Sequence, residues 1–343
     1  SSSFYMDNLP DWLINFQNQK PASEYMPSNW QLKNEFSHNL DSLSSSKGFG
    51  IIKSTPYGNT ILTDLALKIL KNEKLGKSNT TDFLSISYSS TDYIGHQYGP
   101  HSMEIYDTYI KLDKDIENLL TYIDNNIGKE NAIVFLTADH GVSSEPSKLI
   151  EYNIPAGYFS KDRMLNNLTT YLRDYFNWPS DNIKASEYIA NFSNNQLFLD
   201  HEFINTNLGF DKKRIFTELC SDYLLKQEGV KNTFTAYQMH HYQYNHSTHA
   251  KIQQGFNHKR SGDVIIELEP GWISESWEDG GTTHGSSHSY DTHVPLIFWG
   301  AKIQNGNTTR LVNVKDIAPT VSSLLEISFP NGCTGNPLIE ITK

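Results

Sequence analysis

Two short segments of this chain each pair a carboxylate with an imidazole, side chains that commonly bind transition metals. Asp139 and His140 directly follow one apolar run, and Asp92 and His96 follow another. Strands that end in this way would deliver one Asp and one His to each of two neighbouring loops. Two such loops would supply ligands for a pair of metal ions. A two-metal site is typical of enzymes that catalyse displacement at phosphorus or a related centre.

A third segment, the Gly-rich loop Gly-Gly-Thr-Thr-His-Gly-Ser-Ser-His, contains His284 between small residues that allow a close approach. Asp92 and His96 are four residues apart, so one helical turn would place both on the same side. We expect His284 to join them as the third ligand of a tetrahedral site. His288 and His293 lie near enough to compete, and we interpret them as supporting or unrelated loop residues.

Each pair alone has a structural alternative. Asp92 and His96 would serve equally as a surface carboxylate and a helix-capping imidazole. Asp139 and His140 would fit a turn at a strand end, with Gly141 in a left-handed conformation. Their occurrence together at one sheet edge favours the metal interpretation.

A tract of five histidines also resembles a metal site. Its spacing is irregular, no acidic residue is close in sequence, and it lies in a segment that we interpret as an insertion, so we favour a structural role. The tract contains His240, His241, His246, His249 and His258.

Composition narrows the class of protein. The chain has 343 residues and a net charge of −11, with a pI of about 5.6. A nucleic-acid-binding surface would need an excess of Lys and Arg, so we expect no nucleic-acid partner. No apolar stretch approaches the roughly 20 residues that span a bilayer. The sequence leaves open the oligomeric state and whether Cys220 and Cys333 form a disulfide.

Hydrophobic periodicity predicts strands and helices in alternation. Apolar residues at helical spacing cover 60–75 and 102–127, while strand-like runs cover 82–88 and 132–138. A strand, a long helix and a second strand form a βαβ unit, so we expect the two strands to be parallel. Both Asp/His loops would then lie at the carboxyl edge of one sheet, where open α/β folds bind ligands.

The alternation of strand and helix patterns stops after residue 144. It resumes with strand-like runs at 263–268 and 294–299 and a helical pattern at 315–326. We therefore predict an α/β/α sandwich with a mostly parallel central sheet and an inserted cap. The expected parts are a first piece of the core at 1–144, the cap at 145–262 and a second piece of the core at 263–343.

In these residues the chain resembles the alkaline phosphatase superfamily, whose signature is Asp-x-x-x-His, then Asp-His, then a late His. The segments 90–96, 137–141 and 283–285 match it in order, and 316–320 resembles the start of the superfamily's final helix. The segments 54–59, 154–157 and 259–264 are most similar to bacterial periplasmic alkaline phosphatases of the type I phosphodiesterase/nucleotide pyrophosphatase branch.

The resemblance implies two zinc ions and a phosphate ester substrate, in a periplasmic or secreted enzyme. Asp92, His96 and His284 would bind one zinc, and Asp139 and His140 the other. The family's nucleophile is a threonine in a segment that would precede Ser1, and no Ser or Thr here lies in a convincing nucleophile context.

The resemblance therefore predicts the C-terminal portion of a phosphomonoesterase that is inactive by itself. A phosphodiesterase or nucleotide pyrophosphatase with the same metals is the alternative enzyme. The non-enzymatic alternative is a fragment that binds metal but catalyses no reaction.

Overall fold

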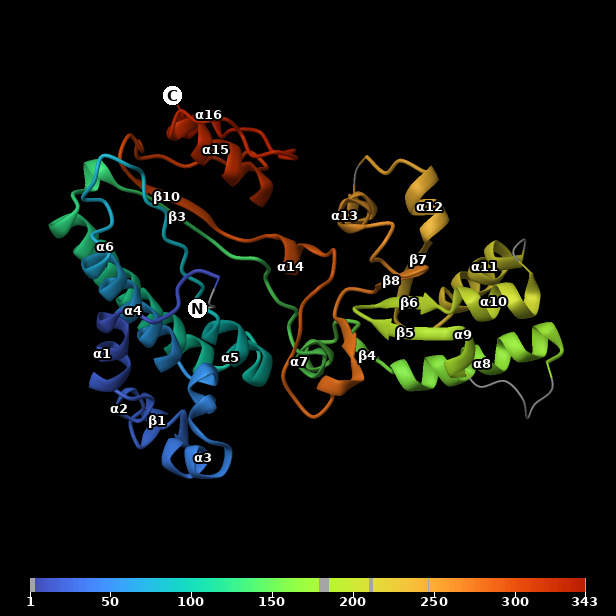
Figure 1. The fold of residues 1–343 in the computed structure, drawn as a ribbon. Helices are drawn as coiled ribbons and strands as arrows, with labels where there is room; N and C mark the ends of the chain where they lie inside the picture. The colour runs from blue at the N-terminus through green and yellow to red at the C-terminus, as the bar shows by residue number, and fades with distance from the viewer. Residues whose placement is uncertain (1–3, 179–184, 210–211, 246, 343) are drawn as a thin grey trace. The chain divides into compact units, whose positions relative to one another are not determined.

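The computed structural model describes residues 4–178, 185–209, 212–245 and 247–342 and divides into two compact units (Figure 1). The first unit comprises 1–94, 102–139 and 294–343, and the second comprises 95–101 and 140–293. The chain therefore crosses between the units four times: within helix α5, after residue 101, between Asp139 and His140, and after residue 293. The three-part division at residues 144 and 262 stays a prediction.

The first unit is mainly helical. Its helices and strands are α1 (Asp11–Gln19), α2 (Ala22–Tyr25), β1 (Asn29–Leu32), β2 (Phe36–Asn39), α3 (Leu40–Lys47), α4 (Tyr57–Asn72), α6 (Met103–Asn126), β3 (Ile133–Thr137), β10 (Leu296–Gly300), α15 (Ile317–Leu324) and α16 (Ile339–Thr342). Helix α5 (Ser90–Tyr98) begins in this unit and continues into the second.

Helices α4 and α6 form the centre of the first unit because each has an apolar stripe at helical spacing. Ala66 and Leu70 of α4 pack in one buried cluster with Leu119 and Ile123 of α6. Ser102 caps α6 by accepting a hydrogen bond from the Ile105 backbone N–H, as expected for a helix N-terminus. The two helices expected at 60–75 and 102–127 are thus present, within a few residues at each end.

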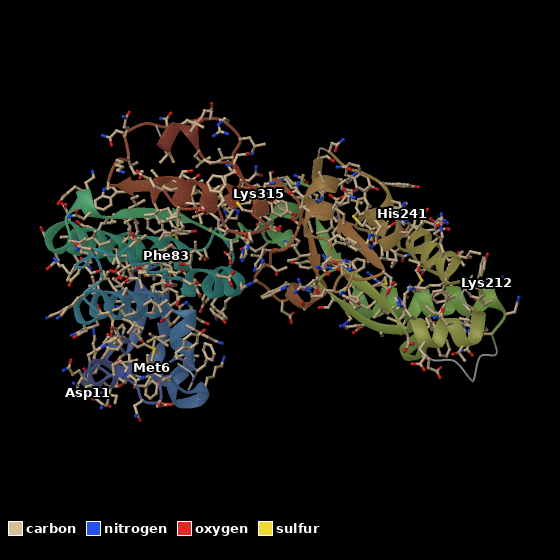
Figure 2. The ribbon with its side chains drawn as sticks, turned by 45° about the horizontal axis from the view of Figure 1, so that its top comes forward. Met6, Asp11, Phe83, Lys212, His241 and Lys315 are labelled. Carbon is tan, nitrogen blue, oxygen red and sulfur yellow. The ribbon has the colours of Figure 1, made fainter. Side chains whose placement is uncertain are left out.

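The predicted strand at 82–88 is wrong, because residues 81–88 have no strand conformation. Leu84 and Ile86 pack instead against the apolar cluster of α4 and α6, which explains their strand-like alternation. Phe83, which is labelled in Figure 2, is 69% exposed. Strand β3 pairs with β10 in antiparallel register, so the expected parallel pairing with 82–88 is absent from the described residues.

The second unit contains the larger sheet. Its helices and strands are α7 (Pro146–Glu151), β4 (Gly157–Phe159), α8 (Lys161–Phe176), α9 (Ala185–Tyr188), β5 (Ile189–Ser193), β6 (Gln196–Leu199), α10 (His201–Leu208), α11 (Lys213–Leu224), β7 (Val230–Thr235), α12 (Ala236–His241), α13 (Ser247–Gly255), β8 (Val264–Leu268), β9 (Trp272–Ser274) and α14 (Ser289–Thr292).

Four of these strands form an antiparallel sheet in the order β5-β6-β8-β7, and β4 pairs with β9 in parallel. Helices α8 and α11 bury Leu168, Leu172 and Phe216 against the sheet. The strand expected at 263–268 is present as β8, but its partners are β6 and β7 rather than the strands of the first unit. Sequence periodicity identifies such a strand but not the strands beside it.

Both cysteines are free thiols, which answers the question that the sequence left open. Cys220 is fully buried on α11, and this burial raises the pKa of its thiol. Its reactive thiolate is therefore disfavoured. None of the described helices is long and apolar enough to cross a membrane.

We expect Leu168→Ala to lower the free energy of unfolding by about 2–5 kcal/mol, because Leu168 is fully buried and truncation leaves a cavity. Leu225→Ala is the matched control, since Leu225 is 46% exposed just beyond α11. Urea unfolding followed by circular dichroism measures both. Equal losses of stability would contradict the placement of the core between α8, α11 and the sheet.

Candidate metal centre

Asp92 and His96 extend from helix α5 one turn apart, as their spacing predicts. Asn59 of α4, only 1% exposed, fixes the start of this helix. Its Oδ1 accepts a hydrogen bond from the Ser90 backbone N–H at 3.3 Å, and its Nδ2 donates to Thr91 Oγ1 at 3.1 Å. The direction of Asp92 therefore depends on a buried amide of the neighbouring helix.

Gly58 lets α4 and α5 approach closely. A Cβ atom at this position would lie 2.2 Å from Ser90 Oγ and 2.8 Å from the Ile52 carbonyl oxygen. Gly58 and Asn59 both belong to the segment 54–59, which the sequence singled out only as a resemblance motif. Its role, which sequence reasoning missed, is to position the start of the helix that carries Asp92.

His96 is oriented by the Gly-rich loop of the second unit. Its Nδ1 donates a hydrogen bond to the Thr282 carbonyl oxygen at 2.8 Å, and the Thr282 N–H donates to the His96 carbonyl at 3.1 Å. The imidazole also stacks on Trp277, with ring centroids 5.1 Å apart and planes at 12°. Because Nδ1 donates to a carbonyl, a metal at His96 would bind through Nε2, and metal-bound histidines commonly donate their other ring N–H in this way.

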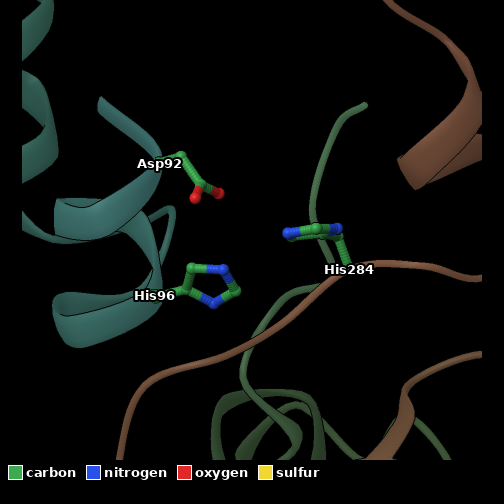
Figure 3. A group of neighbouring side chains, drawn as sticks. All are labelled: Asp92, His96 and His284. Atoms are coloured by element: carbon green, nitrogen blue, oxygen red, sulfur yellow. The ribbon is translucent and has the colours of Figure 1, made fainter. Parts of the chain in front are cut away.

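His284 converges on Asp92 and His96 (Figure 3). One potential ligand atom from each of the three residues lies within 4.8 Å of the other two. Helix α5 fixes Asp92 relative to His96, and the second unit fixes His96 relative to His284, with ring centroids 5.0 Å apart. One carboxylate and two imidazoles form a donor set that zinc accepts in a tetrahedral site.

His140 lies beside this cluster, because its ring stacks on His284 with centroids 3.3 Å apart and planes at 14°. Its Nδ1 donates to the Gly141 carbonyl oxygen at 2.9 Å, so a metal at His140 would bind through Nε2. Asp139 is the preceding residue of the chain. The structure thus places His140, an expected ligand of the second zinc, next to the expected ligands of the first.

Backbone hydrogen bonds tie the loop after His140 to the loop around His284. Gly141 N–H donates to the Asp291 carbonyl at 2.7 Å, and Val142 N–H donates to the Tyr290 carbonyl at 3.1 Å. Gly141 is not left-handed, contrary to the structural alternative for this turn. It is required for a different reason, since a Cβ there would lie 2.0 Å from the Tyr290 carbonyl oxygen.

Asp291 is a second residue that sequence reasoning missed. It is 97% buried (3% exposed), and its Oδ2 accepts a hydrogen bond from the Ser286 N–H at 2.6 Å while its carbonyl accepts from Gly141. It therefore holds both histidine loops. No local motif marks it, because its partners are distant in sequence or bound through the backbone.

Two of the other histidines that the sequence singled out, His288 and His249, have structural partners. His288 is buried and its Nε2 donates to the Leu268 carbonyl at 2.9 Å. His249 of the histidine tract lies 3.9 Å from Glu267 Oε2, so the tract does have an acidic partner that local sequence could not reveal. His246 lies outside the described residues.

Comparison with known proteins identifies the family of this chain. The family model described as type I phosphodiesterase / nucleotide pyrophosphatase matches residues 3–291, so the chain belongs to that family. Within it the chain is similar to alkaline phosphatases. It is 34% identical to alkaline phosphatase PhoV of Synechococcus elongatus and 31% identical to alkaline phosphatase PafA of Elizabethkingia meningoseptica. It is also 35% identical to a protein of Myroides odoratus named as a calcium-transporting ATPase.

These alignments include 99–100% of this chain but only 64–65% of each relative, so the chain spans about two thirds of their length. The crystal structure of wild-type PafA superposes with a TM-score of 0.85 at 30% identity, over 99% of this chain and 68% of that one. The predicted α/β fold of the alkaline phosphatase type is confirmed by this match.

Gly281→Ala should loosen the orientation of His96. Gly281 has φ +87°, and an added Cβ would lie 2.2 Å from the His96 carbonyl oxygen, so either the loop or α5 must move. We expect zinc affinity to fall by about tenfold or more, the scale seen when residues that orient metal ligands are altered.

Gly280→Ala is the matched control, because Gly280 also has a positive φ but no atom lies within 4 Å of its added Cβ. Competition with a chromogenic chelator measures zinc affinity for both variants. An equal effect of the two substitutions would show that backbone strain alone, not the contact with His96, determines the loss.

Proposed function

We propose that this chain forms the metal-binding part of a zinc-dependent alkaline phosphatase that hydrolyses phosphate monoesters. The observation that carries the proposal is the convergence of Asp92, His96 and His284 within 4.8 Å, in a member of the type I phosphodiesterase / nucleotide pyrophosphatase family. The names of two similar relatives, the alkaline phosphatases PhoV and PafA, support the monoester activity. By the same likeness we propose a periplasmic or secreted location.

The proposed site has two zinc ions. Asp92, His96 and His284 would hold the first, and Asp139 and His140 would contribute to the second. Bound zinc would supply Lewis acidity to a phosphoryl oxygen and stabilise charge on the attacking and leaving oxygens. The stacking of His140 on His284 supports a paired site, since it brings the two sets of ligands together.

The protein's own contribution to the reaction is orientation. The Thr282 and Gly141 carbonyls each accept a hydrogen bond from the Nδ1 of a histidine, which fixes the tautomer and ring direction. Asp92 would offset one of the two positive charges of a bound zinc ion. A site fixed in this way needs no rearrangement of these histidines when charge develops at phosphorus.

The nucleophile is proposed to be a threonine upstream of Ser1, as the family resemblance implies, and to form a phosphothreonine intermediate. In this proposal the 343 residues bind zinc but do not turn over by themselves. A phosphodiesterase or nucleotide pyrophosphatase with the same metals is the second candidate, and the name of the matching family favours it. The third candidate is non-enzymatic: a protein that binds metal but catalyses no reaction, even with its upstream segment present.

Asp92→Asn should reduce the zinc bound by the chain, because an amide is a much weaker zinc ligand than a carboxylate. Asp124→Asn is the control, since Asp124 is an exposed carboxylate on α6. Elemental analysis after dialysis against micromolar zinc gives the stoichiometry. Equal zinc content in both variants would contradict the assignment of Asp92 as a ligand.

Turnover separates the candidate functions. We expect the 343-residue chain to hydrolyse p-nitrophenyl phosphate negligibly, and a longer protein that includes the upstream threonine to hydrolyse it faster than bis-p-nitrophenyl phosphate. A faster diester rate would replace the first candidate by the second, and no turnover of either ester would favour the non-catalytic candidate. Enzyme-like turnover by the 343 residues that His284→Ala abolishes would refute the upstream nucleophile.

A further inference from the structure

Glu267 is a buried carboxylate in strand β8 of the second unit. It is 4% exposed, and all five residues of the strand, Val264-Ile265-Ile266-Glu267-Leu268, are buried. The other four are apolar. Burial of a carboxylate costs free energy unless other groups compensate it, and well-packed apolar residues often stabilise a protein equally well. The stability of the sheet alone therefore does not explain a carboxylate at this position.

Side chains of β7 and α13 surround this carboxylate with hydrogen-bond donors and positive charge. Asn232 Nδ2 donates to Glu267 Oε2 at 2.7 Å, and Lys231 Nζ lies 3.5 Å from Oε1. His249 of the histidine tract, on α13, has its Nε2 3.9 Å from Oε2. The carboxylate is therefore bound on a strand and on a helix that are both distant in sequence from β8.

These partners keep Glu267 ionised although it is buried. Burial raises the pKa of its carboxyl group. Hydrogen bonds from Asn232, Thr248 and Ser287, together with the charge of Lys231, lower the pKa by more. The net pKa lies below its usual value, so Glu267 is a carboxylate at neutral pH and accepts charge-assisted hydrogen bonds.

Ser287 connects this carboxylate to the loop that carries His284. Its Oγ donates to Glu267 Oε1 at 3.1 Å, three residues after His284. The next residue, His288, donates from Nε2 to the carbonyl of Leu268, beside Glu267 on β8, at 2.9 Å. The loop is thus bound to two consecutive residues of one strand.

Helix α13 makes a further contact with the same loop. Lys251 Nζ donates to Thr292 Oγ1 at 2.7 Å and to the Ser287 carbonyl oxygen at 3.4 Å. Because Lys251 is exposed, water competes for its ammonium group. The better-shielded bond from Ser287 to Glu267 is therefore the stronger constraint on the loop.

We propose that Glu267 is a positioning residue for the zinc site, and that through Ser287 it fixes the loop that presents His284 to the metal. Altering groups that orient metal ligands commonly changes metal affinity by about 10- to 100-fold. The identity of the metal rests on the proposed function, whereas the restraint on the loop does not depend on metal.

Amide hydrogen exchange of the metal-free chain, in EDTA, tests the restraint directly. Glu267→Leu removes the acceptor for Ser287 and keeps a side chain of similar size. We expect the amides of 284–292 to exchange at least about tenfold faster than in the wild type, because the loop opens locally more often, while those of α8 stay unchanged. Unchanged exchange in 284–292 would overturn the proposal.

Zinc affinity, from competition with a chromogenic chelator, tests whether the restraint serves the metal. Glu267→Leu and Ser287→Ala should each weaken zinc binding by about tenfold. The double variant should bind no more weakly than the weaker single variant, because both substitutions remove the same bond. Additive losses would show that Glu267 does not act through Ser287.

Three variants separate positioning from general stability. Glu267→Gln keeps an oxygen that accepts from Ser287, so its zinc affinity should stay within about threefold of the wild type. Ile266→Val is the control, since Ile266 is 3% exposed on the same strand but packs in the apolar core, and it should lower stability without changing zinc affinity. An equal loss of affinity in Ile266→Val and Glu267→Leu would assign the effect to destabilisation and overturn the positioning role.

Two outcomes distinguish this proposal from the proposed function. A wild-type chain that binds no zinc would refute the proposed function, while faster exchange in Glu267→Leu would still establish the restraint on the loop. Faster exchange with unchanged zinc affinity would overturn the positioning role. If Glu267→Leu does not fold, Ser287→Ala decides, because Ser287 is only partly buried. Wild-type exchange and zinc affinity in Ser287→Ala would refute the proposal.

Discussion

The hydrogen bonds between three loops of the second unit are the constraint on which the candidate site depends. The Thr282 carbonyl fixes the ring of His96, the Tyr290 and Asp291 carbonyls hold the loop after His140, and Asp291 also holds the turn after His284. The bonds to the Thr282, Tyr290 and Asp291 carbonyls join segments far apart in sequence, whereas the bond from the Asp291 side chain to Ser286 is local. Together they hold in place the segments that carry His96, His140 and His284.

These hydrogen bonds require backbone segments to lie very close together, and glycine permits this because it has no Cβ atom. An added Cβ at either Gly141 or Gly281 would lie about 2 Å from a carbonyl oxygen of the neighbouring loop. Two further glycines admit the indole of Trp272, because an added Cβ at Gly157 or Gly229 would lie 2.7 or 2.1 Å from the ring. Glycine thus serves both the metal loops and the packing of Trp272, in each case because a neighbouring group comes closer than a side chain would allow.

The sequence predicted the features that depend on local pattern. The stripes of α4 and α6, the helical turn from Asp92 to His96 and the late position of His284 follow from spacing and residue type. Prediction from the sequence failed for features that depend on contacts between distant parts of the chain. The apolar residues of 82–88 pack on helices instead of pairing as a strand, and β8 pairs within the second unit. Contacts made through the backbone, such as those of Asp291, leave no local signature.

The central claim is that Asp92, His96 and His284 bind zinc and that His140 belongs to a second ion beside it. Anomalous diffraction at the zinc edge, on crystals of the chain grown with zinc, measures this most directly. The account predicts one strong peak among Asp92, His96 and His284 and a second next to Asp139 and His140. A map with no peak at these residues, or with zinc only at other histidines, would contradict it.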